Sequence, residues 1–174
     1  MNSRNNSDVS ITEDRRRTTD ALQVGDEAPD FTLPTQNEGE LNLRWYRGRK
    51  HVVLAFYPGD FTPICATQIP EYQAVMEEFD KYNAQLLAIS VDSMACHAAW
   101  AKSLGGLSFP LMSDYYPHGE VARKYGVLNE KKERTVFLID REGKIRWIER
   151  LQPFDLPDNE ELFRQLARLN KEYP

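Results

Sequence analysis

The order of apolar segments predicts an α/β fold in which a mixed sheet carries helices on both faces. Two near-continuous apolar runs, at residues 51–57 and 85–91, are typical of strands that are buried on both sides. Between them, residues 63–80 place apolar side chains at helical spacing. Because strand, helix and strand follow one another, we expect the two strands to be parallel and joined by a right-handed crossover.

The remaining segments extend this sheet at both ends of the chain. A turn at 36–40 separates the first apolar segment from a short return strand, and a Gly-containing turn at 141–143 suggests an antiparallel hairpin. The expected elements are strands within 24–34 and at 41–43, a helix at 94–104, an extended piece at 109–111, a helix at 118–125, hairpin strands at 134–140 and 144–148, and a helix from Asp158 to Lys171. This outline is that of a thioredoxin-like fold with extra N-terminal strands.

Composition excludes several classes of function. The 174 residues suit one domain, and 41% hydrophobic with 28% charged residues is ordinary for a soluble globular protein. A net charge of −5 lacks the basic footprint of a nucleic-acid binder. No apolar stretch approaches the ~18 residues of a membrane span, so we expect neither nucleic acid nor membrane as a partner.

The first residues are expected to lie outside the folded domain. Residues 1–21 contain few apolar side chains, and the run Arg15–Arg17 is followed by polar residues rather than by the apolar segment of a secretory signal. We therefore predict a disordered or loosely attached tail at 1–21, a single domain at 22–174 and a cytoplasmic location. Two cysteines are too few for a disulfide framework.

Cys65 is the candidate reactive residue. The strand at 51–57 leads into a tight turn, Thr62 is a suitable N-cap and Pro63 fits the first helical position. Cys65 then falls in the first turn, where free backbone N–H groups and the positive end of the helix dipole favour a thiolate. A thiolate can attack a peroxide oxygen and become a sulfenic acid. The alternative is a small apolar side chain packed under the helix.

The pattern Pro58-x-x-x-Thr62-x-x-Cys65 resembles the active-site signature of the peroxiredoxins of the AhpC/TSA superfamily. The resemblance runs from Leu22 to about Lys171. Further matching segments are Val24–Asp26 with Ala28–Phe31, Ser90–Ser93 with His97 and Trp100, Phe109–Leu111 with Ser113–Asp114, Tyr125–Val127, and Arg134 with Phe137–Asp140.

This resemblance implies a role for each matching residue. Cys65 corresponds to the nucleophile, Thr62 to the hydroxyl that orients the peroxide, and Pro58 to the residue that shields the thiolate from water. Arg134 corresponds to the arginine that holds the sulfur and polarises the O–O bond, although it could be an ordinary strand arginine. Gln68 departs from the pattern, because many members carry glutamate there. No cofactor or metal is implied, since the sulfur carries both electrons.

The resemblance also implies the reaction and its partners. We expect a thiol-dependent peroxidase that reduces hydrogen peroxide, organic hydroperoxides or both, and whose sulfenic acid is recycled by an external thiol. That thiol is a low-molecular-weight compound or a thioredoxin- or glutaredoxin-like protein. The segment Tyr116–Gly119 looks like the one-cysteine alkyl hydroperoxide reductase E type. Members commonly dimerise, so we expect a homodimer or a higher homo-oligomer.

Four other interpretations of the sequence can be compared with this one, and the residue spacing argues against the first two. A disulfide reductase would need a Cys-x-x-Cys pattern at the helix start, and here Thr62 takes the place of the first cysteine. A metal site is not supported by the spacing of its candidate ligands, which are Cys65, Cys96, His51, His97 and His118. The third is a redox sensor or holdase on the same scaffold. The fourth is a two-cysteine peroxidase in which Cys96 resolves the sulfenic acid.

The position of Cys96 argues against efficient resolution. Cys65 and Cys96 each follow the carboxyl end of a predicted parallel strand, so their sulfurs could lie at the same sheet edge. A disulfide requires Cα atoms within about 7 Å. Both cysteines fall early in predicted helices, and both helices would have to move. We therefore expect an external thiol to reduce the sulfenic acid.

Overall fold

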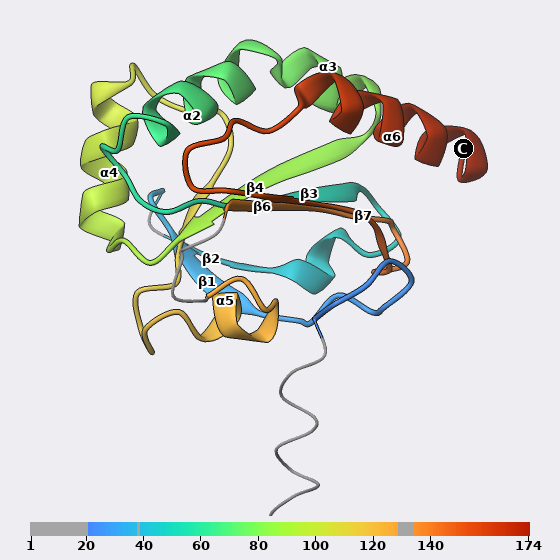
Figure 1. Ribbon diagram of the computed structural model, residues 1–174, viewed down its shortest axis with the longest axis horizontal. Helices are drawn as coiled ribbons and strands as arrows, with labels where there is room; N and C mark the ends of the chain where they lie inside the picture. Colours follow the sequence, from blue (N-terminus) through green and yellow to red (C-terminus); the bar gives the residue numbers. More distant parts are fainter. Residues whose placement is uncertain (1–20, 38, 129–133) are drawn as a thin grey trace, which may run out of the picture.

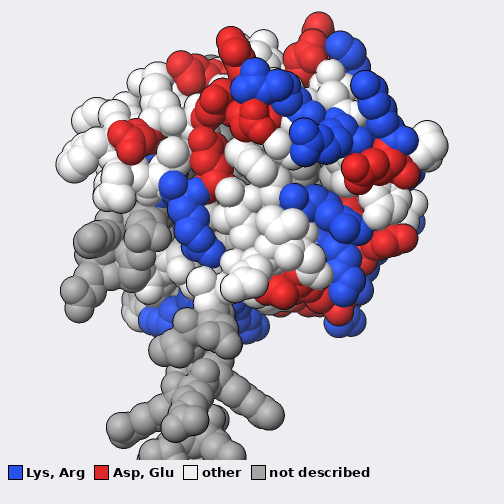
Figure 2. Space-filling model, turned by 45° about the vertical axis from the view of Figure 1, so that its right-hand side comes forward, with Lys and Arg blue, Asp and Glu red and all other residues white. Residues whose placement is uncertain are grey.

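The computed structural model describes residues 21–37, 39–128 and 134–174 (Figure 1). Apart from Ala21, the predicted tail at 1–21 lies outside these described residues. None of the helices in the described ranges is both long and apolar enough to cross a membrane. Acidic and basic side chains are interspersed on the face of the molecule shown in Figure 2.

A seven-stranded mixed sheet forms the centre of the fold, with strand order β2-β1-β5-β4-β3-β6-β7. The strands are β1 (Thr32–Thr35), β2 (Gly39–Asn42), β3 (His51–Phe56), β4 (Ala84–Ser90), β5 (Leu111–Ser113), β6 (Arg134–Ile139) and β7 (Ile145–Leu151). β3, β4 and β5 are parallel, whereas β6 is antiparallel to β3 and to β7. The predicted parallel pair, the predicted hairpin and the predicted mixed sheet are therefore confirmed.

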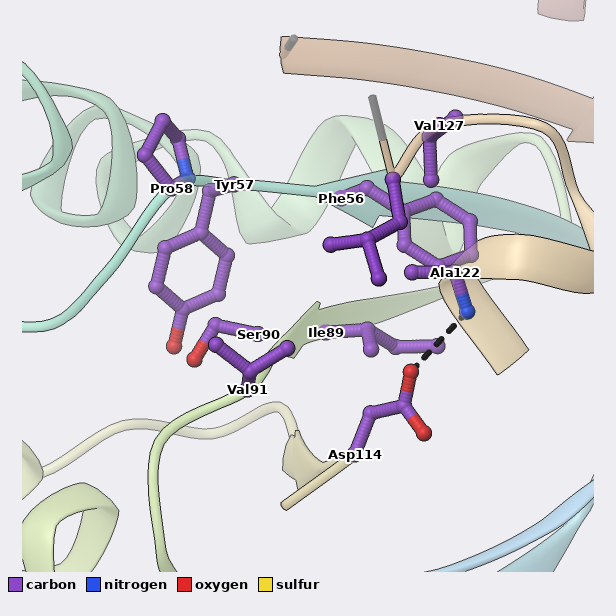
Figure 3. Close-up of a pocket in the computed structure, with 10 residues that line it drawn as sticks. Phe56, Tyr57, Pro58, Ile89, Ser90, Val91, Asp114, Ala122 and Val127 are labelled. Atoms are coloured by element: carbon purple, nitrogen blue, oxygen red, sulfur yellow. Dashed lines mark hydrogen bonds between the residues drawn. The ribbon is translucent and has the colours of Figure 1, made fainter. Parts of the chain in front are cut away.

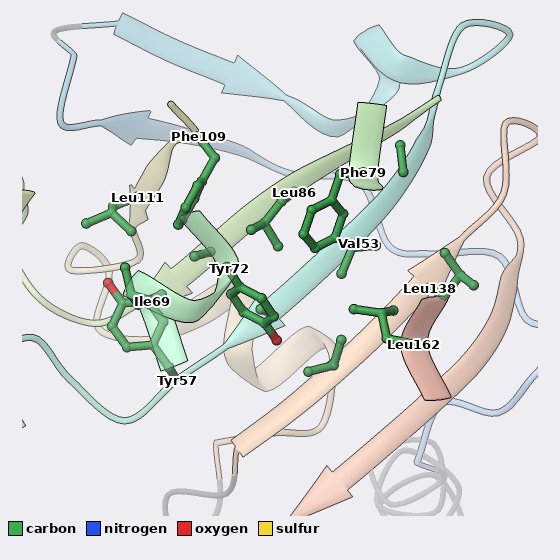
Figure 4. Close-up of a cluster of buried hydrophobic side chains, with 14 of the residues drawn as sticks. Val53, Tyr57, Ile69, Tyr72, Phe79, Leu86, Phe109, Leu111, Leu138 and Leu162 are labelled. Carbon is green, nitrogen blue, oxygen red and sulfur yellow. The ribbon is translucent and has the colours of Figure 1, made fainter. Parts of the chain in front are cut away.

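Helices cover both faces of the sheet, as predicted (Figure 1). On one face lie α2 (Cys65–Ala74), α3 (Met76–Lys81), α4 (Met94–Ser103) and α6 (Asn159–Glu172), and on the other lie α5 (Glu120–Lys124) and the 3-10 helix η1 (Leu43–Tyr46). Because side chains alternate along a strand, Val53 of β3 packs under the first group of helices (Figure 4) and Leu54 packs under the second. Both faces of β3 are thus buried, which explains its unbroken apolar sequence.

The structure corrects two of the predicted elements. The single helix expected at 63–80 is in fact two helices, because Val75 has a non-helical backbone (φ −116°, ψ 22°) and its N–H bonds to the Tyr72 carbonyl, only three residues back. A β-branched residue is a weak helix former, so a break there costs little. Of the extended piece expected at 109–111, only Leu111 belongs to a strand, because β5 begins there and pairs with β4 from Leu111 onward. The predicted cap at Asp158 is confirmed by its bond from the Glu161 N–H.

The carboxyl ends of β3, β4 and β5 meet at one edge of the sheet because these three strands are parallel. Arg134, the first residue of antiparallel β6, lies at the same edge, since β6 runs in the opposite direction beside β3. Cys65 begins α2, which follows β3, and Cys96 lies in the first turn of α4, which follows β4. The topology therefore collects the candidate site residues at a single edge.

The imidazole ring of His51, at the start of β3, is buried in the protein interior. Neither ring nitrogen has a partner among the described residues, and the side chain is 1% exposed. Burial, and secondarily the nearby Arg141 guanidinium, lowers the pKa of His51, while Asp140 opposes this effect. The folded protein therefore favours the neutral ring.

We expect the free energy of unfolding to fall as the pH is lowered through about 6.5, the ordinary histidine pKa. The unfolded chain binds a proton at His51 in this range and the folded chain does not, so protonation favours unfolding. His51→Phe should reduce this pH dependence in urea unfolding followed by circular dichroism, whereas replacement of the exposed His118 by Gln should leave it unchanged. Identical pH profiles for His51→Phe and the wild type would contradict the assignment.

Candidate active site

Cys65 is the first residue of α2 and its side chain is completely buried. The preceding loop positions it: Ile64, not Thr62, is the N-cap residue, and it has helical backbone angles. The Thr62 hydroxyl instead donates to the Gly59 carbonyl (2.8 Å), and the Thr62 carbonyl accepts from the Ala66 N–H (2.8 Å). The prediction that the Thr62 side chain caps the helix is therefore wrong, because its hydroxyl is turned back into the loop. The N–H groups of Ala66, Thr67 and Gln68 bond to the carbonyls of Thr62 and Ile64, so the free N–H groups expected in the first turn are not found at these three positions.

Arg134 reaches the sulfur from β6. Its two terminal nitrogens lie 3.4 and 3.5 Å from Cys65 Sγ, and the side chain is 1% exposed. Nη1 also donates to Gln68 Oε1, and Nη2 donates to the Pro153 carbonyl (3.2 Å) in the loop after β7. The sequence is also compatible with an arginine exposed on the surface of a strand. In the structure both faces of β6 are buried, and the guanidinium faces the sulfur.

The charge of Arg134 is the main electrostatic feature of this site. A guanidinium is always protonated, and its burial is costly unless charge and hydrogen bonds compensate it. Within the described ranges Arg134 makes no ion pair with a carboxylate. A thiolate at Cys65 would provide the missing negative charge, and the guanidinium would then donate charge-assisted hydrogen bonds to it.

A buried hydrogen-bond network supports the loop between β3 and α2. Asp60 accepts a hydrogen bond from the Tyr57 hydroxyl (2.7 Å) and contacts His97 Nδ1 (2.6 Å), and both side chains of the Asp60–His97 pair are 0% exposed. His97 Nε2 donates to the Met112 carbonyl of β5 (3.1 Å). Both ring nitrogens of His97 are therefore satisfied, one by Asp60 and one by the carbonyl of Met112. The network ties the loop to α4 and β5.

Asp60 was missed by sequence reasoning because a turn aspartate and a buried one look alike in a sequence. His97 and Trp100 act as hydrogen-bonding and packing residues here, since the Trp100 ring packs 5.9 Å from Tyr57 and 6.1 Å from Phe61 between centroids. Phe61 itself has φ 58°, an uncommon angle for a bulky residue. The fixed neighbours on both sides maintain this strained backbone beside the reactive cysteine.

Cys96 lies in a different environment from Cys65. Its thiol points toward Asp92 Oδ1 (3.9 Å), and burial, followed by the nearby Asp60 and Asp92 carboxylates, raises the pKa of Cys96 to about 11. Ligand atoms of Asp60, Asp92 and Cys96 lie within 4.8 Å of one another. The carboxylates are already engaged, however, since Asp92 Oδ2 accepts from Ser90 Oγ (2.6 Å) and the Asp60 N–H (2.8 Å). This group is a hydrogen-bond network rather than a set of free ligands.

Pro58 borders an apolar pocket at the carboxyl edge of the sheet. Pro58, Val91 and Val127 contribute to the walls of this pocket (Figure 3). At one side, Asp114 accepts hydrogen bonds from the N–H groups of Val121 and Ala122 and thereby fixes the start of α5. The pocket ends beside the loop that carries Thr62, while the role expected for Pro58 as a shield stays a prediction.

Comparison with known proteins places this arrangement in a family. Residues 24–148 match the AhpC/TSA family. Alkyl hydroperoxide reductase E of Mycobacterium tuberculosis is 44% identical over 140 residues, which are 79% of this chain and 91% of that protein. The reduced 2-Cys peroxiredoxin of Plasmodium vivax has a similar structure, with a TM-score of 0.79 and 30% identity over 87% of this chain and 85% of the other. A yeast mitochondrial 1-Cys peroxiredoxin also has a similar structure, with a TM-score of 0.78 and 28% identity over 87% of this chain and 78% of the other.

The chain therefore belongs to the AhpC/TSA family, and it is a thiol-dependent peroxidase of the peroxiredoxin type. This confirms the resemblance inferred from the sequence. The similar structures include both one-cysteine and two-cysteine peroxiredoxins, so the number of cysteines in the catalytic cycle has to be argued from the site itself.

Proposed function

We propose that Cys65 is the peroxidatic cysteine and that it reduces hydrogen peroxide, organic hydroperoxides or both. The observation that carries this proposal is the contact of a buried sulfur at a helix start with both terminal nitrogens of Arg134, at 3.4 and 3.5 Å. These donors can stabilise a thiolate and, during the reaction, negative charge on the departing oxygen. No other described cysteine has such donors, because Cys96 faces carboxylates.

The first step forms an S–O bond and breaks the O–O bond of the peroxide. The thiolate attacks one oxygen, which remains on Cys65 as a sulfenic acid, and the other oxygen leaves with the electron pair and takes a proton to become water or an alcohol. Arg134 donates to the oxygens as charge moves onto them. Thr62 Oγ1 donates to Gly59 and can still accept a hydrogen bond from a peroxide O–H, which would orient the substrate.

An external thiol is the proposed reductant. It displaces the sulfenic oxygen as water and forms a mixed disulfide with Cys65, and a second thiol then releases the Cys65 thiolate and the oxidised reductant. Cys96 is unsuited to the first of these steps, because its raised pKa of about 11 leaves little thiolate at neutral pH. The reductant is either a small thiol or a thioredoxin- or glutaredoxin-like protein.

The same sheet edge is the proposed surface for self-association. Large exposed apolar side chains follow the carboxyl ends of the three parallel strands or lie beside them: Phe61, Val91, Met94, Tyr115, Tyr116 and Leu128. A homodimer or higher homo-oligomer would remove them from water. Light scattering on the reduced protein tests this. The cytoplasmic location, which suits a thiol-dependent enzyme, is part of the same proposal.

Cys65→Ser should abolish peroxide reduction while the fold persists, because serine cannot form a sulfenic acid. Multiple-turnover peroxide consumption with dithiothreitol as reductant measures this. Cys96→Ser is the matched control and should retain activity. An active Cys65→Ser protein would refute the proposed role of Cys65, and a wild type limited to one turnover would favour a redox sensor or holdase.

Arg134→Ala should slow the reaction with hydrogen peroxide by about 10²-fold or more, because one set of aimed donors is lost. It should also reduce the fraction of Cys65 present as thiolate at neutral pH. Stopped-flow tryptophan fluorescence and iodoacetamide alkylation measure the two effects. Arg150→Ala, on the exposed side of β7, is the control. Unchanged rates in Arg134→Ala would assign Arg134 a purely structural role.

After one equivalent of hydrogen peroxide, Cys65 should be trapped as a sulfenic acid while Cys96 remains free. The structure places the Cys96 thiol against Asp92 and leaves Cys65 against Arg134. Mass spectrometry with a sulfenic-acid probe distinguishes the outcomes. Rapid and quantitative formation of a Cys65–Cys96 disulfide would instead establish the two-cysteine mechanism.

A further inference from the structure

The loop between β7 and α6, residues 152–157, brings one backbone group to the active site. The Pro153 carbonyl accepts a hydrogen bond from Arg134 Nη2 (3.2 Å), and the same guanidinium faces the sulfur of Cys65. The side chains that contact Arg134 in this site belong to α2, whereas the carbonyl belongs to the loop. The alignment of the guanidinium therefore depends on where this loop lies.

Little within the loop itself fixes the position of this carbonyl. Among the described residues, the loop has one backbone hydrogen bond of its own, which closes the turn at 152–155 (3.1 Å). Its large apolar side chains do not anchor it by burial, because Phe154 is 84% exposed and Leu156 is 40% exposed. The rings of Pro153 and Pro157 restrict the backbone. The loop is thus a stiff segment whose position is set mainly at its two ends.

Glu149 of β7 holds the end of the loop that leads into α6. Its Oε1 accepts a hydrogen bond from the Asp158 N–H (3.2 Å), and Asp158 Oδ1 in turn accepts from the Glu161 N–H (3.0 Å) as the cap of α6. The other end of the loop is held by the sheet, where Leu151 pairs with Arg134. Glu149 therefore closes the loop that carries the Pro153 carbonyl.

The carboxylate of Glu149 is costly where it lies. Its Oε2 is buried and has no partner among the described residues. Burial, opposed by the hydrogen bond from Asp158 and reinforced by the charges of Asp158 and Glu161, raises the pKa of Glu149. Tyr72 of α2 also lies near this carboxylate. An apolar side chain would avoid the cost of burying an unpaired oxygen, so the arrangement points to a role for the oxygen that is paired.

We propose that Glu149 is a positioning residue for the peroxidase reaction: by holding Asp158 it fixes the loop at 152–157, so that the Pro153 carbonyl keeps Arg134 aligned with Cys65. This inference rests on the proposed roles of Cys65 and Arg134. The acceptor oxygen of Glu149 is the property that matters, and its negative charge is not. A negative charge near the site would by itself disfavour a thiolate.

The test compares Glu149→Met with Glu149→Gln. Both variants remove the charge at similar length, but only glutamine keeps an oxygen that can accept from the Asp158 N–H. Glu149→Met should lower the single-turnover rate with hydrogen peroxide in stopped flow by about three- to tenfold, because Arg134 is less well aligned. It should also raise the midpoint of Cys65 alkylation by iodoacetamide against pH by about half a unit, less than the loss of a whole opposite charge would. Glu149→Gln should keep the rate, and its midpoint should not rise, because loss of the charge alone favours the thiolate.

Two further variants keep the outcome interpretable. Pro153→Gly keeps the carbonyl but frees the loop backbone, so it should also lower the rate and raise the midpoint, and it serves if Glu149→Met does not fold. Glu160→Met removes the same charge from an exposed position in the first turn of α6 and should change neither quantity. Equal rates and midpoints in Glu149→Met and Glu149→Gln, or wild-type values in Pro153→Gly, would overturn the inference. An active Cys65→Ser protein would refute the proposed function itself, which is a separate result.

Discussion

The contact between the Arg134 guanidinium and the Cys65 sulfur is the interaction on which the site depends. It joins the first residue of β6 to the first residue of α2, two positions that lie 69 residues apart in the sequence. Burial makes the contact strong, because a charge that has left water is stabilised only by partners that the fold supplies. The other side-chain and backbone acceptors of the guanidinium, Gln68 and Pro153, are neutral, so Cys65 is the contacting group that can compensate the positive charge of Arg134.

Other residues at the carboxyl edge of the sheet hold the loop before α2 in place and thereby keep Cys65 next to Arg134. Asp60, His97 and Tyr57 form a buried network that ties the loop before α2 to α4 and β5. Gly59 and Thr62 close the loop on itself through the threonine hydroxyl. The strained angle at Phe61 is tolerated because the loop is fixed on both sides. A reactive group benefits from this rigidity, since small displacements of its donors are costly for the reaction.

The two cysteines show how local charge separates two otherwise similar residues. Both follow parallel strands, both begin or nearly begin a helix, and both are free thiols. Cys65 faces a cation, whereas Cys96 faces Asp92 and lies close to Asp60, and the pKa of Cys96 is raised first by burial and then by these carboxylates. Helix position alone therefore does not make a cysteine a nucleophile, and the sign of the nearest charge decides.

The sequence by itself determined the fold class, the parallel pair and the hairpin and pointed to Cys65 as the candidate reactive residue, because unbroken apolar runs, turn residues and a short motif are local signals. Arg134 could be singled out only by resemblance, and its approach to the sulfur follows from the antiparallel pairing of β6 with β3. The starts and breaks of helices were harder to predict from the sequence. Thr62 was expected to cap α2, but its hydroxyl donates to the Gly59 carbonyl instead. The helix expected at 63–80 is divided at Val75. The buried contact between Asp60 and His97, and the contact between Gln68 and Arg134, were decided only by the tertiary structure. Whether a polar side chain is solvated or paired in the interior depends on residues far away in the chain, and that information is absent from any local pattern.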